Sequence, residues 1–408
     1  SDRLLVGDLS GGEKIKFQLL CEMLRRPTVL LLDEPSNDLD LQSVKWLEGF
    51  IRDSRIPIMF VSHDETLLEH CANTIIHLEQ LMRKRQPQHT MARLTYPEYV
   101  RARNERIIKQ TQVAQKEKEE HEAKMERYRQ VYQRVHHEQQ KVSRQAPHEA
   151  KNLKDKMRSL KSMGRRFEKE RDHLAKRPDF EESIVVRFED EIVIPQGKVV
   201  LDLQLATLKV GERVLSRDVH LNIQGPEKVC IVGANGAGKT TLLRRVLEDL
   251  THRGIHFGYM PQDYSEQMNP RESAIEFLTI SGTRDENTTI RTYLGSMNFT
   301  AEEMYHPIVD LSGGQRAKLY FSKMILEKAE VLVLDEPTRN LSPLSGPEIR
   351  AALQAFGGSV IAVSHDRKFL AEVFHRVLLL DEKGLRPLHA SEWTNESRSD
   401  ISQGFGGS

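Results

Sequence analysis

Apolar residues along this chain follow two patterns, short continuous runs and spacings of three or four residues. Residues 331–334 (VLVL) form a continuous apolar run, as expected for a parallel strand buried on both faces. Residues 229–232 (VCIV) form a similar run, and apolar residues at helical spacing follow from Leu242 to Leu250. These patterns predict an α/β fold in which buried strands are followed by helices.

A different pattern covers residues 101–177, where candidate buried positions recur at alternating four- and three-residue steps. The first series is Ile107, Thr111, Ala114, Lys118, His121, Met125, Tyr128, Tyr132 and Val135, and the second is Ala150, Leu153, Met157, Leu160, Gly164, Phe167, Arg171 and Leu174. We predict two long helices that fold back as an antiparallel hairpin around residues 142–148. The first, of about 40 residues, would extend ~60 Å.

This segment is basic, although the 408-residue chain as a whole has a net charge of zero. Residues 101–177 carry 23 Lys and Arg against 12 Asp and Glu, a net charge of +11. Such an excess favours phosphate backbones without base-specific reading, whereas a solvated spacer is the alternative interpretation. The candidate RNA-contacting residues are Arg144, Lys151, Lys154, Lys156, Arg158, Lys161, Arg165 and Arg166.

Length and composition indicate how many domains the chain forms and in which compartment it is expected. A chain of 408 residues is expected to form two or three domains. Its three cysteines are far apart and no apolar run is long enough to span a membrane, so we expect a cytoplasmic protein. Because the chain starts at Ser1 and enters a motif within ten residues, we expect it to be a fragment of a longer protein.

Three sequence blocks occur twice at a fixed offset of 302 residues. LSGGE at 9–13 recurs as LSGGQ at 311–315, DEP at 33–35 recurs at 335–337, and VSHD at 61–64 recurs at 363–366. A glycine-rich phosphate-binding loop, in contrast, occurs once, at 233–241. The repeat therefore indicates a duplicated domain of which one copy is incomplete in this chain.

The single loop matches the pattern GxxxxGK[ST] between a predicted strand and a predicted helix, the context that this motif requires. Its backbone N–H groups and the helix N-terminus would bind phosphate oxygens, with Lys239 between the β- and γ-phosphates and the Thr240 hydroxyl as a Mg²⁺ ligand. The predicted nucleotide-binding residues of the loop are Gly233, Asn235, Gly236, Gly238, Lys239, Thr240 and Thr241.

Acidic residues end the two apolar strands of the repeat. Asp335 would hold Mg²⁺ through water, and Glu336 would orient or deprotonate the attacking water. His365 lies 29 residues after Glu336, and His63 lies 29 residues after Glu34. A lone histidine near a strand end is usually structural, but the repeated spacing favours a γ-phosphate sensor.

The LSGG blocks place a serine and two glycines at a helix start. This is usually only a helix cap, yet one domain does not need a second anion site, so a nucleotide bound by another domain is the expected ligand. The residues concerned are Ser10, Gly11, Gly12 and Glu13 in the first block and Ser312, Gly313, Gly314 and Gln315 in the second.

The order P-loop, Gln262, LSGGQ, LDEP and SHD resembles the ATP-binding-cassette (ABC) ATPase domain. This resemblance implies a head-to-tail pair of cassettes, with ATP between one P-loop and the opposite signature, and Gln262 as a further Mg²⁺ and catalytic residue. The loop at 233–241 would pair with the signature at 9–13, and Asp40 would reach towards this P-loop. The second ATP site would need a P-loop upstream of Ser1.

Two departures from the ABC pattern affect these expectations. Ser342 stands where the first copy has Asp40, which leaves open whether the second site hydrolyses in the same way. From Glu189 through His256 there is no Phe, Tyr or Trp to stack on adenine, which leaves the preference for ATP over GTP open.

Two cassettes separated by a basic hairpin resemble the ABC-F family of translation factors. Residues 161–168 (KSMGRRFE) and 338–345 (TRNLSPLS) resemble its antibiotic-resistance branch in particular. The resemblance implies binding to the ribosomal E site, with the hairpin near P-site tRNA, 23S rRNA and the peptidyl-transferase centre, and protection against lincosamides, streptogramin A and pleuromutilins. A housekeeping ABC-F factor that gates translation is the nearest alternative, and a transporter ATPase subunit is a more distant one.

The expected architecture is therefore tandem P-loop ATPase domains joined by a long antiparallel helical hairpin. Residues 1–90 would be the C-terminal part of the first cassette, and 91–180 the hairpin. Residues 181–394 would form the complete second cassette, followed by a polar tail at 395–408. The two cassettes would pair within one chain.

Overall fold

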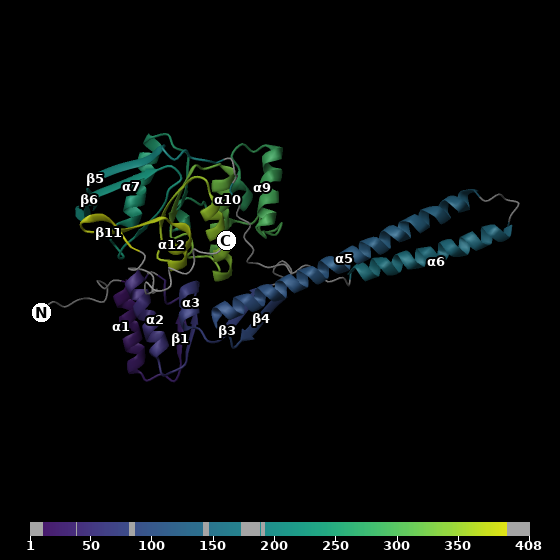
Figure 1. The fold of residues 1–408 in the computed structure, drawn as a ribbon, viewed down its shortest axis with the longest axis horizontal. Coiled ribbons are helices and arrows are strands. Elements are labelled where there is room, and N and C mark those ends of the chain that lie inside the picture. Colours follow the sequence, from purple (N-terminus) through teal and green to yellow (C-terminus); the bar gives the residue numbers. More distant parts are fainter. Residues whose placement is uncertain are drawn as a thin grey trace, which may run out of the picture. The chain divides into compact units, whose positions relative to one another are not determined.

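The computed structural model describes residues 11–37, 39–80, 86–141, 147–172, 188 and 192–389. The chain divides into two compact units (Figure 1). One unit joins Ser1–Asn73, called the first repeat below, to Glu182–Ser408, called the second repeat. The other, called the hairpin unit, is Thr74–Glu181.

A six-stranded sheet forms the centre of the second repeat, in the order β12-β11-β7-β10-β9-β8. The strands are β7 (Lys228–Val232), β8 (Phe257–Met260), β9 (Val331–Asp335), β10 (Ser359–Val363), β11 (Arg376–Asp381) and β12 (Gly384–Pro387). Neighbouring strands pair in parallel except β12, which is antiparallel to β11. The long strands β5 (Val199–Val210) and β6 (Arg213–Gln224) form a separate antiparallel ribbon.

Helices cover both faces of this sheet. They are α7 (Lys239–His252), α8 (Ala274–Leu278), α9 (Arg284–Ser296), α10 (Gly313–Leu326), α11 (Gly346–Ala355) and α12 (Arg367–Val373), with short 3₁₀ turns η2 (Tyr264–Glu266), η3 (Ile308–Asp310) and η4 (Pro343–Ser345). Alternate residues of β9 serve two cores: Val331 and Val333 share one with α7, and Leu332 and Leu334 share the other with α10. Full burial of each such side chain stabilises the fold by about 1.5–3 kcal/mol. The continuous apolar run was therefore correctly interpreted as a strand buried on both faces.

The first repeat reproduces part of this fold at the offset of 302 residues. Its elements are α1 (Gly11–Leu24), β1 (Leu30–Asp33), α2 (Leu41–Asp53), β2 (Ile58–Val61) and α3 (Glu65–Cys71). Helices α1 and α3 have the same bounds as α10 and α12 once 302 is added. The strand register is also preserved, since Asp33 is aligned with Val61 as Asp335 is with Val363. The duplication seen in the motifs thus extends to backbone structure.

One face of the β1–β2 pair is exposed. Leu31, Met59 and Val61 are 70%, 52% and 54% exposed. Their equivalents in the second repeat, Val333, Ile361 and Val363, are buried in the core that α7 contributes to. Within the described residues, the first repeat lacks a helix over this face.

The hairpin unit combines a β-hairpin with two long helices. Strands β3 (Ile75–Gln80) and β4 (Gln86–Ala92) pair antiparallel, and α5 (Tyr96–Lys141) and α6 (Pro147–Asp172) follow (Figure 1). Tyr128 packs edge-on against Phe167, while Val135 lies in a cluster with Met157 and Leu160, so the helices are antiparallel.

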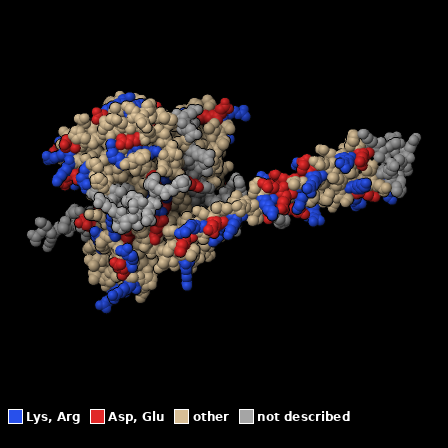
Figure 2. Space-filling model, viewed as in Figure 1, with Lys and Arg blue, Asp and Glu red and all other residues tan. Residues whose placement is uncertain are grey.

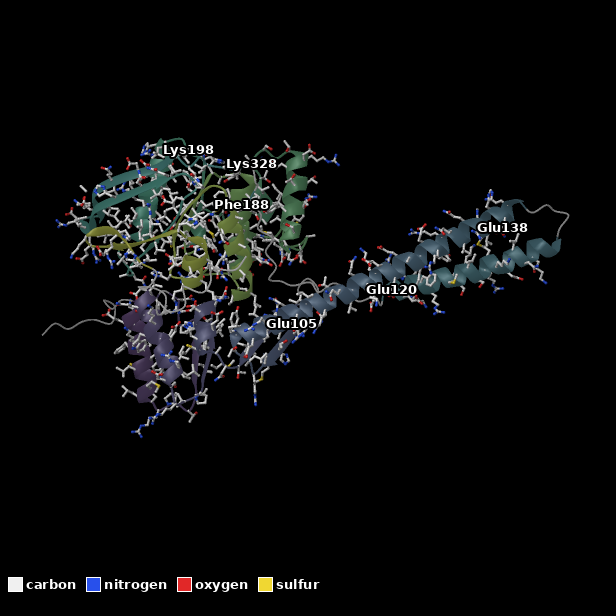
Figure 3. The ribbon with its side chains drawn as sticks, viewed as in Figure 1. Glu105, Glu120, Glu138, Phe188, Lys198 and Lys328 are labelled. Atoms are coloured by element: carbon white, nitrogen blue, oxygen red, sulfur yellow. The ribbon has the colours of Figure 1, made fainter. Side chains whose placement is uncertain are left out.

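The two predicted helices are confirmed, and α5 has 46 residues where about 40 were expected. The predicted seam is buried or half-buried from Ile107 to Val135 except at Lys118, which is exposed. Lysine at this position keeps its ammonium group in water. Residues 142–146 of the predicted turn lie outside the described residues. Figure 3 shows acidic side chains along α5, including Glu105, Glu120 and Glu138.

Candidate nucleotide-binding site

The phosphate-binding loop connects β7 to α7. Gly236 and Gly238 have φ angles of 80° and 98°, which side-chain-bearing residues rarely adopt. The Lys239 ammonium donates hydrogen bonds to the carbonyl oxygens of Gly233 at 2.8 Å and Ala234 at 3.2 Å. Burial lowers the pKa of Lys239, opposed by the nearby carboxylates of Glu336 and Asp335. The loop therefore holds a cation beside a ring of backbone groups suited to phosphate.

Thr240 and Asp335 form the second part of the site. The Thr240 hydroxyl donates to Asp335 Oδ2 at 2.8 Å. Burial raises the pKa of Asp335, and the hydrogen bond from Thr240 opposes that shift. A hydroxyl and one carboxylate, completed by phosphate oxygens and water, are a typical Mg²⁺ ligand set. The described residues contain no cluster of three His, Cys, Asp or Glu side chains able to hold a metal ion by themselves.

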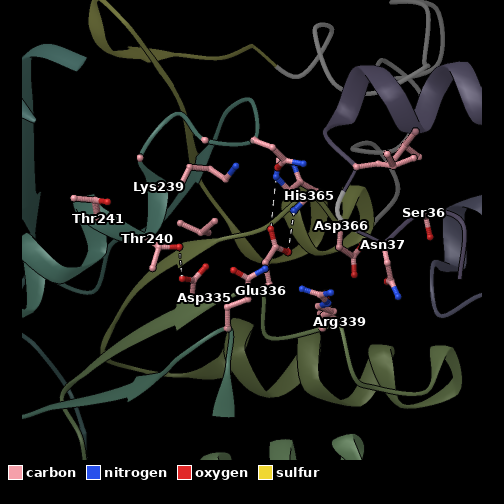
Figure 4. Close-up of a pocket in the computed structure, with 18 of the residues that line it drawn as sticks. Ser36, Asn37, Lys239, Thr240, Thr241, Asp335, Glu336, Arg339, His365 and Asp366 are labelled. Carbon is pink, nitrogen blue, oxygen red and sulfur yellow. Dashed lines mark hydrogen bonds and ion pairs between the residues drawn. The ribbon is translucent and has the colours of Figure 1, made fainter. Parts of the chain in front are cut away.

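Glu336 and His365 lie together at the ends of β9 and β10 (Figure 4). The His365 backbone N–H donates to Glu336 Oε2 at 3.4 Å, and Nε2 of the ring lies 3.7 Å from Oε1. Burial raises the pKa of Glu336 to about 8, and the Lys239 ammonium opposes this shift. Burial and the same ammonium lower the pKa of His365 to about 3. The imidazole is therefore neutral at pH 7.

The ring nitrogens of His365 have no hydrogen-bond partner in the described part of the protein, although both are buried. Buried polar atoms are normally paired, and an unpaired one carries a free-energy cost. A neutral imidazole offers one donor and one acceptor. A phosphate oxygen or an attacking water is a suitable partner for it.

The first repeat holds an equivalent pair in a more exposed setting. The His63 backbone N–H donates to Glu34 Oε2 at 3.2 Å, and its Nε2 lies 3.2 Å from Oε1. Glu34 and Glu336 also share a positive φ, of 44° and 51°. However, the His63 side chain is 44% exposed and that of His365 is 15% exposed. Only the second-repeat pair is therefore enclosed.

A cavity of about 490 Å³ brings these groups together, a volume within the range of small-molecule sites. From the sequence-predicted residues it collects Asn235, Gly236, Gly238, Lys239, Thr240, Thr241, Gln262, Asp335, Glu336, His365 and His63. Both repeats contribute, and Figure 4 shows Ser36 and Asn37 of the first repeat on the side of Asp366, across the site from Lys239 and Thr240. The site is therefore composite.

The sequence reasoning missed other lining residues. Val210, Arg213 and Leu215 come from the turn between β5 and β6, and Arg339 comes from the loop after β9. The sequence has no aromatic ring in this region to stack on adenine, and no other base-binding side chain was proposed from it. An exposed guanidinium between aliphatic residues was the signal that could have identified the turn.

The structure describes only part of the first signature, residues 11–13. Ser10 lies outside the described residues, and Gly11, Gly12 and Glu13 begin α1 without lining the cavity. Gly12 packs closely on α2, because a Cβ there would clash with Ser43 Oγ. The described residues of this signature are therefore not among those that line the cavity.

Asp40 of the first repeat caps α2 by accepting a hydrogen bond from the Ser43 N–H at 2.9 Å. Its negative charge also affects the pKa of two residues of the site. Burial lowers the pKa of both Lys239 and His365, and Asp40 is among the groups that oppose this.

The second signature forms a helix cap in this structure. Ser312 Oγ accepts from the Gln315 N–H at 3.2 Å, and Gln315 Oε1 accepts from the Ser312 N–H at 2.9 Å, a complete capping box. Gly313 and Gly314 lie against Asn340. None of the four residues lines the described cavity.

The candidate RNA-contacting side chains lie on α6. Lys151, Lys154, Lys156, Arg158, Lys161, Arg165 and Arg166 are all exposed, and Arg144 lies outside the described residues. Arg166 pairs with Glu170 at 3.1 Å. Figure 2 shows basic and acidic side chains interspersed along the hairpin unit on the face in view. The positive excess is therefore spread over a mixed surface.

Among the helices of the described residues, none is long and apolar enough to cross a membrane.

The model of the ABC transporter family matches residues 216–339. The chain is 31% identical over 389 residues to Ribosome protection protein VmlR of Bacillus subtilis, covering 92% of this chain and 69% of that protein. It is 28% identical over 389 residues to human ATP-binding cassette sub-family F member 3, covering 93% of this chain and 51% of that protein. The chain thus spans about half the length of the human relative.

Among solved structures, a similar fold occurs in the archaeal ribosome recycling factor aABCE1, crystallised with the ribosomal stalk protein aP1. The TM-score is 0.55 at 17% identity, covering 94% of this chain and 65% of that one. At this identity the likeness concerns the fold alone.

Proposed function

The chain belongs to the F subfamily of ABC ATPases, and we propose that it binds the ribosome and protects it from antibiotics. The observation that carries the proposal is the similarity to the Bacillus ribosome protection protein, which includes both repeats and the hairpin unit. The proposed targets are drugs of the lincosamide, streptogramin A and pleuromutilin types.

In this proposal the α5–α6 hairpin acts near P-site tRNA, 23S rRNA and the peptidyl-transferase centre while the protein occupies the E site. The exposed cations of α6 support contact with phosphate backbones, which gives affinity without base selection. Tyr128, Tyr132 and Phe167 are occupied in packing between the helices. This leaves charge as the main means of RNA recognition on the described surface.

The substrate is ATP in the composite cavity. Lys239 would move from the loop carbonyls to the β- and γ-phosphates, and Thr240, Asp335 and Gln262 would hold Mg²⁺. The ion would neutralise phosphate charge during transfer. Val210, Leu215 and Arg213 would contact the base, with the guanidinium stacking in place of an aromatic ring.

Glu336 is the proposed general base. Its raised pKa keeps most of the carboxyl population protonated at neutral pH. A pKa near the operating pH suits a base that must accept a proton. His365, being neutral, would orient the attacking water or the γ-phosphate through its unpaired ring nitrogens.

Binding and hydrolysis would switch the two repeats between closed and open states. ATP favours the closed state only through contacts that it makes there with both repeats. Ser10, Gly11, Gly12, Glu13 and Asp40 are the proposed first-repeat groups of that closed site.

The hairpin proposal is tested by neutralising Lys154, Lys161 and Arg165 together to Gln. Removing one phosphate-binding cation reduces the slope of log affinity against log salt by about 0.7–0.9. We expect weaker co-sedimentation with ribosomes and a slope smaller by about 2–3. Gln substitutions at the exposed Lys209, Arg245 and Lys383 of the second repeat form the control. An unchanged slope in the hairpin variant would exclude these residues as phosphate ligands.

A translation factor that gates elongation by energy status is the second candidate. The human sub-family F member matches 93% of this chain at 28% identity, against 92% at 31% for the Bacillus protein, so membership of the family by itself leaves this alternative open. Drug susceptibility of cells with and without the full-length gene separates the two functions.

A further inference from the structure

Two buried ion pairs join the repeats outside the nucleotide cavity. Both guanidinium Nη atoms of Arg367 in α12 donate to the Glu48 carboxylate of α2, with Nη1 at 3.3 Å from Oε2. Arg350 of α11 donates to Glu65 of α3, with Nη1 at 2.7 Å from Oε1 and Nη2 at 3.3 Å from Oε2. The four side chains are only 4–9% exposed.

These pairs are related by exchange of the two repeats. Adding the repeat offset of 302 to Glu48 gives Arg350, and adding it to Glu65 gives Arg367. The observed contacts are Glu48 with Arg367 and Arg350 with Glu65, so each position meets the other position of the opposite repeat. That is the contact pattern of a twofold interface. The sequence, however, breaks the symmetry in charge: both acids are in the first repeat and both bases in the second.

Other charged side chains surround these two ion pairs. His70 Nδ1 lies 3.3 Å from Glu48 Oε1, whereas its equivalent Glu372 accepts from Arg350 Nε at 2.6 Å. The Lys368 ammonium adds contacts to Glu65 at 3.0 Å and Glu69 at 2.5 Å. The opposition in charge therefore extends to Glu69 and Lys368, whereas Asp64 and its equivalent Asp366 are acidic in both repeats and Glu372 is an acid of the second repeat.

Charge separation of this kind determines which repeats can pair. Two first repeats in the same arrangement would bring Glu48 against Glu65 twice, and two second repeats would bring Arg350 against Arg367 twice. Buried like charges are strongly unfavourable, because each loses water without gaining a partner. Repulsion against wrong partners is an established source of specificity.

We infer that Glu48, Glu65, Arg350 and Arg367 form a pairing code that joins a first repeat to a second repeat and rejects like repeats of another chain. Because both repeats are on one chain, the effective concentration favours pairing within the molecule. The inference rests on the geometry of the nucleotide-free protein and does not depend on the proposed ribosomal function.

The first experiment is a charge-reversal cycle on the full chain without nucleotide. Glu48→Arg and Arg367→Glu should each lower Tm by roughly 5–10 °C, and the double variant should recover most of that decrease. The same cycle with Lys198→Glu and Glu330→Lys is the matched control, because this pair has a 3.1 Å separation but is half-exposed and lies within the second repeat (Figure 3). It should show little coupling.

The second experiment measures association by light scattering. Arg367→Glu makes the second repeat self-complementary, since the introduced carboxylate can meet Arg350 of another chain in both directions. This variant should form more dimer than wild type. Arg367→Ala removes the same cation without introducing an acid and should not. Adding Glu48→Arg to Arg367→Glu restores opposite charges within the chain, so the effective concentration should bring the dimer fraction back towards that of wild type.

Additive effects in the cycle, with no recovery in the double variant, would overturn the pairing itself. Recovery without extra dimer in Arg367→Glu relative to Arg367→Ala would overturn the rejection of like repeats. Should either reversal prevent folding, the equivalent reversals at Arg350 and Glu65 give the same two readouts, and the milder cycle of Glu48→Gln and Arg367→Gln gives the coupling between the two residues.

Discussion

Glu336 has a backbone conformation that costs about 1–3 kcal/mol for a residue with a side chain. Its φ of 51° is matched by 44° at Glu34, so the strain belongs to the repeated motif. The turn directs the carboxylate towards His365 and the P-loop, where burial raises its pKa to about 8. Local strain and burial thus combine at one residue of the candidate site.

Replacing this carboxylate tests its role in hydrolysis. We expect Glu336→Gln to lower phosphate release by about 10²–10⁴-fold, because general base catalysis contributes that range. Nucleotide binding should persist, and the full-length variant should accumulate on ribosomes. Glu302→Gln, at an exposed carboxylate beside His306, provides the control for removal of one acid. Normal turnover in Glu336→Gln would remove Glu336 from the proposed mechanism.

For Glu336→Gln we also expect a change in how the stability of the fold depends on pH. The folded pKa of Glu336, about 8, lies above the ordinary 4.5, so its contribution to stability is full below about pH 4.5 and is lost as pH rises through about 8. Glu336→Gln lacks this pH-dependent decrease. Its Tm without nucleotide should exceed that of wild type by several degrees at pH 9 and by little at pH 5.

Glu330→Gln, at a half-exposed surface carboxylate, controls for the removal of one charge in the pH series. Parallel Tm curves for wild type and Glu336→Gln would contradict a buried, ionisable carboxyl group in the nucleotide-free site.

At the scale of elements, the helical hairpin shows how far periodicity carries a prediction. The spacing of apolar positions predicted both helices and their antiparallel packing, because the 3.6-residue turn places these positions on one face. Gly164 was assigned to the seam from spacing alone. The structure supplies the reason that glycine is required, since a Cβ there would lie 2.5 Å from the Tyr128 hydroxyl.

Two helical glycines test this packing. Gly49 of α2 has open space around its Cβ position, so Gly49→Ala should raise stability by about 0.5–1 kcal/mol through helix propensity. Gly164→Ala gains the same propensity but must displace Tyr128, and should lower the stability of the hairpin unit by about 1 kcal/mol. Thermal melts followed by circular dichroism distinguish the two. Equal stabilisation by both would show that the helices separate freely at Gly164.

The two signature elements show the limit of motif reading. Ser312 and Gln315 were predicted to bind nucleotide, and in the structure they form a capping box at the start of α10. A cap and an anion site use the same backbone N–H groups, so residue type alone does not distinguish them. Their role in nucleotide binding stays a prediction.

At the scale of the whole molecule, the sequence by itself determined the features that short stretches of neighbouring residues form. Apolar runs and helical spacing predicted the α/β fold and the hairpin, and the 302-residue offset predicted the duplicated elements. The P-loop residues were also recognisable, because a short contiguous segment forms them. Each of these features depends on neighbours within a few turns or strands.

Only the tertiary structure decided which distant residues meet. The cavity joins Arg213 to Ser36 and Asn37, and the buried pairs join Glu48 to Arg367 and Glu65 to Arg350. The sequence shows that these acids of the first repeat are replaced by arginines at the equivalent positions of the second. No pattern of neighbouring residues specifies, however, that position 48 meets position 367 rather than 350. That choice follows from packing α2 and α3 against α11 and α12, where burial makes every unpaired charge costly.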